Sequence, residues 1–154
     1  MPARILIVDD HEIVREGIRT LLARARPEWE ICGEATNGED GIEAVRSLKP
    51  DVVVLDITMP KMSGLEAAAQ IAQLGVASRV LMFTMHDSAR LSLDVRHAKA
   101  HGLVLKSQAA RDLIRAIDRL LAGGTFFASE PVPSSESKLG DELGADLPSK
   151  NSTS

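Results

Sequence analysis

The sequence is poor in several features, and each absence excludes a class of protein or site. Cys32 is the one cysteine among 154 residues, so neither an intrachain disulfide nor a cysteine cluster for a metal can form. The formal net charge of −4 gives no electrostatic footprint for nucleic acid. We see no amino-terminal signal peptide and no apolar run that approaches the length of a membrane span. We therefore expect a cytoplasmic protein without a membrane partner.

Short apolar runs alternate along the chain with segments whose apolar residues recur at the helical period. The runs predict strands over 5–8, 29–35, 52–56, 79–84 and 102–105. The helical periods predict helices over 11–25, 37–49, 63–74, 88–98 and 109–122. This alternation predicts an α/β fold: a doubly wound, five-stranded parallel sheet with helices on both faces. The length suits one such domain.

The composition changes after Phe127. Residues 128–154 are rich in serine, proline and acidic residues, and two lysines against five acids give this stretch a net charge of −3. It lacks aromatic residues and has little to bury, so we expect an acidic, disordered tail. Residues 1–127 are then the folded domain.

The predicted strands end in side chains that can bind a metal or a phosphoryl group. Asp9 and Asp10 follow the first strand, and Asp56 ends the third. Thr84 ends the fourth strand, and Lys106 follows the fifth. Because the carboxyl ends of parallel strands lie at one edge of the sheet, where ligands bind in open α/β folds, these side chains should meet. Three carboxylates, a hydroxyl and an ammonium group predict a site for a divalent metal and a phosphoryl group.

These residues stand in motifs that resemble those of bacterial two-component response regulators. The motifs are Val-Asp-Asp-His at 8–11, Asp-Ile-Thr-Met-Pro-Lys-Met-Ser-Gly-Leu-Glu at 56–66, Thr84, and Leu-Lys at 105–106. The chain over 3–127 is similar to a receiver domain of the type that usually precedes a helix-turn-helix output domain. The resemblance implies a flavodoxin-like receiver fold.

The resemblance also implies roles for the strand-end residues. A carboxylate can attack phosphorus and form an acyl phosphate, and Asp56 is the expected acceptor. Lys106 is expected to contact the oxygens of the transferring phosphoryl group. The Thr84 hydroxyl is expected to donate a hydrogen bond to that group once it is attached.

A magnesium ion is the expected cofactor. Mg²⁺ takes few protein oxygens and keeps waters and phosphate oxygens, and it would let three neighbouring carboxylates stay ionised. The expected ligands are the carboxylates of Asp9, Asp10 and Asp56. By the resemblance, the backbone carbonyl of Thr58 joins them.

The function that follows is phosphorelay signal transduction and not an enzymatic activity of its own. The expected partner is a histidine kinase or a phosphotransfer protein, which supplies the phosphoryl group. The face formed by the fourth helix, fifth strand and last helix is expected to carry the output and to allow a homodimer. The tail has neither the apolar pattern nor the charge of a helix-turn-helix domain, so we expect a stand-alone receiver that does not bind DNA.

Two alternatives remain open at this point. One is a receiver-like interaction module that is never phosphorylated. The other is a magnesium-dependent phosphatase with an aspartyl-phosphate intermediate. Such enzymes commonly carry a second acid two residues after the nucleophile, where this chain has Thr58.

A few further residues attract attention without carrying a function. His11, His97 and His101 are expected to be solvated, the last two at the end of a helix. Ile13 and Met62 flank the predicted pocket as apolar residues that are either docking contacts or packing.

Overall fold

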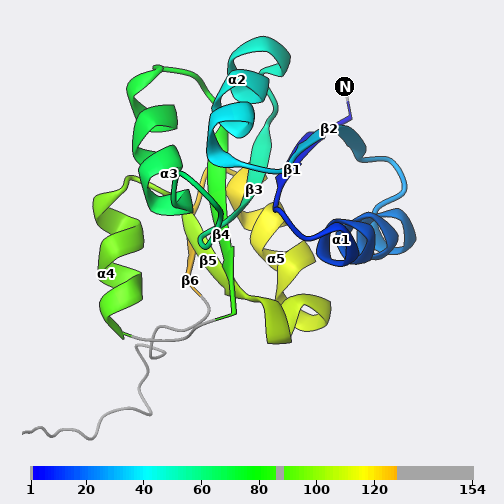
Figure 1. Ribbon diagram of the computed structural model, residues 1–154. Coiled ribbons are helices and arrows are strands. Elements are labelled where there is room, and N and C mark those ends of the chain that lie inside the picture. Colours follow the sequence, from blue (N-terminus) through cyan, green and yellow to red (C-terminus); the bar gives the residue numbers. More distant parts are fainter. Residues whose placement is uncertain (1, 86–88, 128–154) are drawn as a thin grey trace, which may run out of the picture.

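The computed structural model describes residues 2–85 and 89–127, and the expected tail at 128–154 lies outside these ranges. Figure 1 shows strands and helices in alternation. The strands are β1 (Arg4–Val8), β2 (Glu30–Ala35), β3 (Val52–Asp56), β4 (Arg79–Thr84), β5 (Gly102–Leu105) and β6 (Phe126–Phe127). The helices are α1 (Glu12–Ala25), α2 (Gly38–Leu48), α3 (Gly64–Gln73), α4 (Ala89–His97) and α5 (Ala109–Leu121). A 3-10 turn, Lys106–Gln108, precedes α5.

The strands form one parallel sheet in the order β2-β1-β3-β4-β5-β6. The chain moves outward from β1 to β2 and then returns to place β3 on the other side of β1. The point at which the strand order reverses therefore lies between β1 and β3, where Val8 is in register with Leu55. The predicted doubly wound parallel sheet is confirmed, and this reversal is where such folds bind ligands.

The prediction of five strands is wrong by one. Gly123, with φ of 91°, turns the chain after α5. The Phe126 N–H then donates to the His101 carbonyl over 3.1 Å, and Phe126 and Phe127 pair with Gly102 and Leu103 of β5. A strand of two residues is too short to show an alternation in the sequence.

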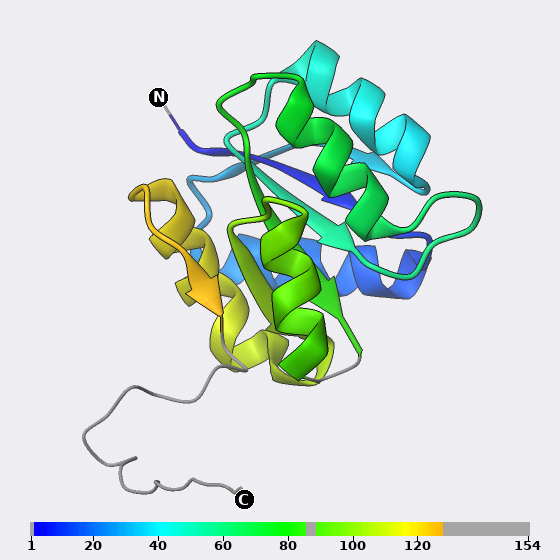
Figure 2. The same ribbon diagram turned by 90° about the vertical axis from the view of Figure 1, so that its left-hand side faces the viewer.

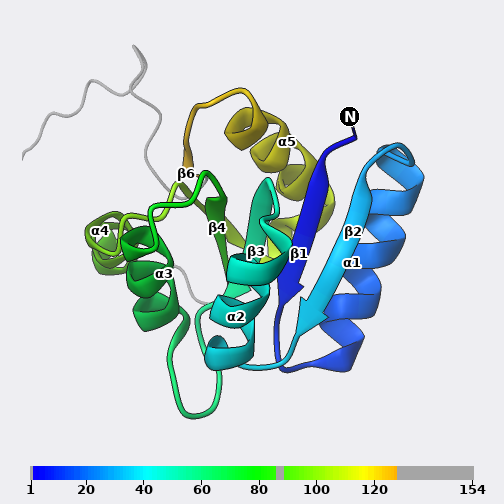
Figure 3. The ribbon, with the colours of Figure 1, turned by 90° about the horizontal axis from the view of Figure 1, so that it is seen from above.

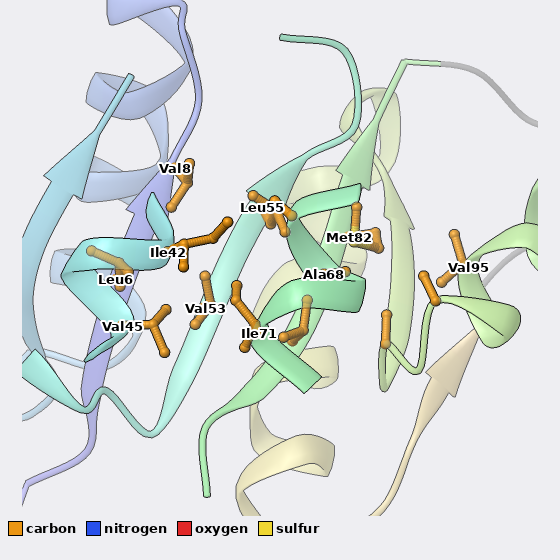
Figure 4. Close-up of a cluster of buried hydrophobic side chains, with 14 of the residues drawn as sticks. Leu6, Val8, Ile42, Val45, Val53, Leu55, Ala68, Ile71, Met82 and Val95 are labelled. Atoms are coloured by element: carbon orange, nitrogen blue, oxygen red, sulfur yellow. The ribbon is translucent and has the colours of Figure 1, made fainter. Parts of the chain in front are cut away.

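Helices cover both faces of the sheet, as Figures 2 and 3 show. α2, α3 and α4 lie on one face, over a cluster that we call the α2–α4 core (Figure 4). α1 and α5 lie on the other, over the α1/α5 core. Neighbours in one strand alternate between the two, so Val53 belongs to the α2–α4 core and Val54 to the α1/α5 core. All five residues of β3 are buried, as a central parallel strand requires.

The two histidines near the end of α4, His97 and His101, differ in their exposure to solvent. α4 ends at His97, which is exposed as expected. Lys99, with φ of 68°, then turns the chain, so His101 does not share that helix. His101 Nδ1 accepts the Val80 N–H over 2.9 Å, and burial lowers the pKa of this imidazole. The expectation of a solvated ring is therefore wrong for His101.

Two features of the sequence can be compared directly with the fold. Cys32 is half-buried in β2, and burial raises the pKa of its thiol. In the part of the chain that the structure describes, no helix combines the length and the hydropathy that a membrane span needs.

Candidate functional site

The strand ends bring the predicted carboxylates together. Asp9 follows β1 and Asp56 ends β3, the two strands on either side of the reversal in strand order. The carboxylates of Asp9, Asp10 and Asp56 and the ring of His11 each offer a ligand atom, and these atoms lie within 4.8 Å of one another. Asp9 and Asp56 are buried, whereas Asp10 faces solvent. The result is an acidic cluster open on one side.

Lys106 balances part of this negative charge. Its Nζ lies 2.9 Å from Asp9 Oδ2 and 3.3 Å from Asp56 Oδ1. The side chain is mostly buried, and β5 delivers it to this place because Lys106 is the first residue after the strand. One ammonium group therefore serves two buried carboxylates, and the cluster keeps a net negative charge.

The ionised form of the Asp56 carboxyl is disfavoured by its surroundings. Burial raises the pKa of this carboxyl and the negative charge of Asp9 adds to the rise, while Lys106 opposes it. Its Oδ1 accepts the Thr58 N–H over 3.3 Å. Its Oδ2 is buried and finds no hydrogen-bond donor among the residues that the structure describes. A cation or an incoming electrophile would satisfy this oxygen.

A cavity of about 110 Å³ opens beside Asp56, lined also by His11, Thr58, Met85 and Lys106. Thr58 therefore lies beside the predicted acceptor. Thr84, also predicted, ends β4 and is buried next to Leu105 in register, but it is not among the residues that line the cavity.

The loop after Asp56 is folded tightly against that residue. The Gly64 N–H donates to the Ile57 carbonyl over 2.7 Å, and a Cβ at Gly64 would lie 2.1 Å from the Asp56 carbonyl oxygen. Ser63 and Glu66 form a reciprocal capping box at the start of α3. The residues at 56–66 thus fix the backbone conformation next to Asp56, and with it the position of the Asp56 carboxylate.

Sequence reasoning missed Arg15, which holds the backbone of the acidic cluster. Its guanidinium is buried, donates to the Asp9 carbonyl over 2.7 Å, and pairs with Glu12 and Glu34. The signal was available, because Arg15 stands at helical spacing from Ile18 and Leu22 on the apolar face of α1.

The two apolar residues that the sequence placed beside the pocket, Ile13 and Met62, differ in exposure. Ile13 is exposed on α1. Met62 is half-buried and packs against the α2–α4 core, with its sulfur 2.9 Å from the place that a Cβ on Gly38 would take. Met62 is therefore a packing residue, whereas Ile13 remains available for a contact.

The donor set fits a hard divalent cation. Carboxylate oxygens are the ligands that Mg²⁺ prefers, and three carboxylates converge here. Two of their buried oxygens, Asp9 Oδ2 and Asp56 Oδ2, have no hydrogen-bond partner among the described residues, although Asp9 Oδ2 pairs with Lys106. A cation also relieves the repulsion that the single ammonium group leaves uncompensated. The residues present are thus compatible with Mg²⁺ at this edge of the sheet.

Comparison with known proteins finds one matching family and relatives that are response regulators. Residues 5–118 match the response regulator receiver domain family. The chain is 36% identical over 132 residues to the nitrate/nitrite response regulator protein NarL of Escherichia coli strain K12; the match covers 86% of this chain and 61% of NarL. The chain therefore spans less than two thirds of that relative's length.

Two solved structures are similar in fold and sequence. A LuxR-family two-component response regulator from Aurantimonas sp. SI85-9A1 superposes with a TM-score of 0.77 at 40% identity, covering 82% of this chain and 89% of that one. The isolated receiver domain of RcsB from Salmonella enterica serovar Typhimurium, with a phosphomimetic, gives 0.75 at 26% identity, covering 82% and 94%. With a family match over most of its length, this chain belongs to the response regulator receiver domains.

Proposed function

We propose that the protein accepts a phosphoryl group on Asp56 from a histidine kinase, a phosphotransfer protein or a small phosphodonor. Receiver domains of two-component systems are characterised by a phosphorylated aspartate and by Mg²⁺ at an acidic pocket. The observation that carries the proposal is Asp56 Oδ2, a buried oxygen without a donor among the described residues, on a side chain that lines the cavity. That oxygen is available to a phosphorus atom entering the cavity.

The proposed reaction moves one phosphoryl group and needs no redox partner. A lone pair on a carboxylate oxygen of Asp56 forms the new oxygen–phosphorus bond. With a phosphohistidine donor, the phosphorus–nitrogen bond breaks and the imidazole leaves with the electron pair of that bond. The product is an acyl phosphate on Asp56.

Four groups are proposed to hold Mg²⁺: the carboxylates of Asp9, Asp10 and Asp56 and the backbone carbonyl of Thr58. The clustering of the three carboxylates and the place of Thr58 beside Asp56 support this assignment. Bound there, the cation supplies positive charge for the phosphoryl oxygens. Arg15 is proposed to support this metal site indirectly, because its guanidinium donates to the Asp9 carbonyl and so fixes the Asp9 backbone relative to α1.

Lys106 and Thr84 are proposed to act on the phosphoryl group from the neighbouring strands. Lys106 already lies 3.3 Å from Asp56 Oδ1, so a phosphoryl group on Asp56 comes within reach of its ammonium. Thr84 stands one strand closer, at the end of β4, and its hydroxyl is proposed to donate to the attached group. Such hydrogen bonds to a phosphate are charge-assisted.

Phosphorylation is proposed to shift an equilibrium between two conformations that a partner reads on α4, β5 and α5, the face that also allows a homodimer. The protein then works as a switch in the cytoplasm and not as an enzyme with a substrate of its own. DNA binding is not proposed for this chain by itself.

Intact-mass measurement with a small phosphodonor tests the proposal. With Mg²⁺, the full chain should gain the mass of one phosphoryl group, and Asp56→Asn should abolish the gain. Asp94→Asn, which changes a partly exposed carboxylate on α4, is the matched control and should label normally. Equal labelling of Asp56→Asn and the parent would refute the assignment of Asp56. No labelling of the parent would favour the unphosphorylated interaction module, and turnover of a phosphate ester would favour the phosphatase.

A further inference from the structure

The ring of His11 faces the carboxylates that are proposed to hold the metal. Its Nδ1 lies 3.2 Å from Asp9 Oδ1 and 3.1 Å from Asp10 Oδ1. His11 also lines the cavity beside Asp56. The sequence suggested a solvated residue at the start of a helix, and the side chain is indeed 60% exposed, but one ring nitrogen is directed at the acidic cluster.

The backbone holds His11 in this position. Its N–H donates to Asp9 Oδ1 over 2.9 Å, and its own carbonyl accepts the N–H groups of Val14 and Arg15 in the first turn of α1. His11 is the N-cap residue of α1, yet its side chain makes no capping hydrogen bond. The ring is therefore not needed to begin the helix and remains directed at the cluster.

The spacing of these atoms matches neighbouring positions around one cation. Ligands at about 2.1 Å from an octahedral cation lie about 3.0 Å apart when they are adjacent. The separations of His11 Nδ1 from Asp9 Oδ1 and from Asp10 Oδ1 are close to that value. Asp56 supplies a second and independent indication of a ligand, because its buried Oδ2 lacks a donor among the described residues and the side chain lines the same cavity.

We infer that His11 is a nitrogen ligand of the divalent cation and biases the site from Mg²⁺ toward Mn²⁺, Co²⁺ and related transition metals. The inference rests on the proposed function, since it concerns the same metal. Mg²⁺ favours oxygen ligands and keeps its waters, whereas imidazole suits the later divalent metals, whose affinity for a mixed nitrogen and oxygen site follows the Irving–Williams order. Neutral His11 binds through the Nδ1 lone pair, and the carboxylates that now pair with that nitrogen turn to the cation instead.

Pulsed electron paramagnetic resonance of Mn²⁺ on the full chain tests the inference directly. A coordinated imidazole nitrogen modulates the electron spin echo of Mn²⁺, so the parent should show nitrogen modulation and His11→Gln should lose it. His97→Gln is the matched control, because it removes an exposed imidazole from the end of α4 and should leave the modulation unchanged. Titration calorimetry should show that His11→Gln weakens Co²⁺ binding by about tenfold or more, a loss that even outer-shell groups of metal sites cause. Binding of Mg²⁺ should be nearly unchanged, because Mg²⁺ favours oxygen ligands.

Asp10→Asn separates this inference from the proposed function. If Asp10→Asn weakens Mn²⁺ binding and the parent shows no nitrogen modulation, the metal site stands and His11 is not a ligand. If Asp10→Asn and Asp56→Asn both bind Mn²⁺ as tightly as the parent, the proposed metal site is wrong, and the inference about His11 falls with it.

Discussion

Replacing Asp56 by Asn should stabilise the metal-free protein, although Asp56 is paired with Lys106. At an effective dielectric constant near 20, the separation of 3.3 Å between Lys106 Nζ and Asp56 Oδ1 corresponds to an attraction of about 5 kcal/mol. Repulsion between ligand atoms of Asp9 and Asp56, at most 4.8 Å apart, is about 3.5 kcal/mol or more by the same measure. The two contributions largely offset one another.

The cost of dehydrating the buried Asp56 carboxylate decides whether Asp56→Asn stabilises or destabilises the protein. Asp56 is 3% exposed, and burying an ion costs several kcal/mol even after the protein relaxes. Lys106 does not become an unpaired charge in Asp56→Asn, because Asp9 Oδ2 stays 2.9 Å from its Nζ. We expect the variant to gain on the order of 1 kcal/mol in the free energy of unfolding.

The gain should depend on pH with a defined sign. Burial and Asp9 raise the pKa of the Asp56 carboxyl in the folded protein, so the folded state holds this proton more tightly than the unfolded state. The stability that Asp56 contributes is fully present below the unfolded pKa and is lost as pH rises through the raised folded pKa. The advantage of Asp56→Asn should therefore vanish at low pH and reach its full size above the folded pKa.

Urea unfolding of parent and variant, in chelator and then in Mg²⁺, provides the assay. At 100-fold above its dissociation constant, Mg²⁺ should stabilise the parent by about 2.7 kcal/mol, and the variant by less because it lacks one ligand charge. A metal-free variant that is less stable than the parent at neutral pH would refute the reasoning, since attraction to Lys106 would then outweigh dehydration.

Three further predictions concern parts of the fold that support the site. Gly64→Ala should lower the free energy of unfolding in urea by at least about 1–3 kcal/mol, because its Cβ would lie 2.1 Å from the Asp56 carbonyl oxygen. The control Gly17→Ala in α1, whose Cβ would meet nothing within 4 Å, should be neutral or stabilising. Equal stabilities of the two variants would contradict the close packing of the loop. Arg15→Met should lower the free energy of unfolding by about 1–3 kcal/mol, because the Asp9 carbonyl loses a buried charged donor. The same variant should weaken Mg²⁺ binding measured by calorimetry. Unchanged Mg²⁺ binding would limit Arg15 to a role in stability. A promoter-sized duplex should show no specific, salt-sensitive retention of this chain in a mobility-shift assay, phosphorylated or not, and a reproducible sequence-specific complex would refute that expectation.

The residues of the acidic edge could be predicted because a local pattern carries them. An apolar run followed at once by Asp9, Asp56 or Lys106 indicates a buried parallel strand and a polar side chain at its carboxyl end. Parallel topology then places those ends together without knowledge of any particular contact. The prediction of the edge needed only the carboxyl ends of the strands, which the last residues of the short apolar runs mark.

Residues whose role depends on distant contacts could not be predicted in the same way. The pairing of Phe126 with Gly102 joins segments far apart in the sequence, and a strand of two residues has no periodicity of its own. The ring of His101 is fixed by the Val80 N–H, which only the sheet brings near. The orientation of His11 follows from how the loop after β1 turns into α1, which neither composition nor spacing reveals.

The division of the interior by the sheet has a consequence for how such a protein can change over generations. Val53 and Val54 are neighbours in sequence, yet they pack in separate cores with no shared side-chain layer. Substitutions that lack shared contacts have nearly additive effects on stability. Substitutions in the layer of α2, α3 and α4 can therefore accumulate with little effect on the layer of α1 and α5, where Arg15 of α1 supports the Asp9 backbone. The sheet lets the two layers of helices evolve at different rates.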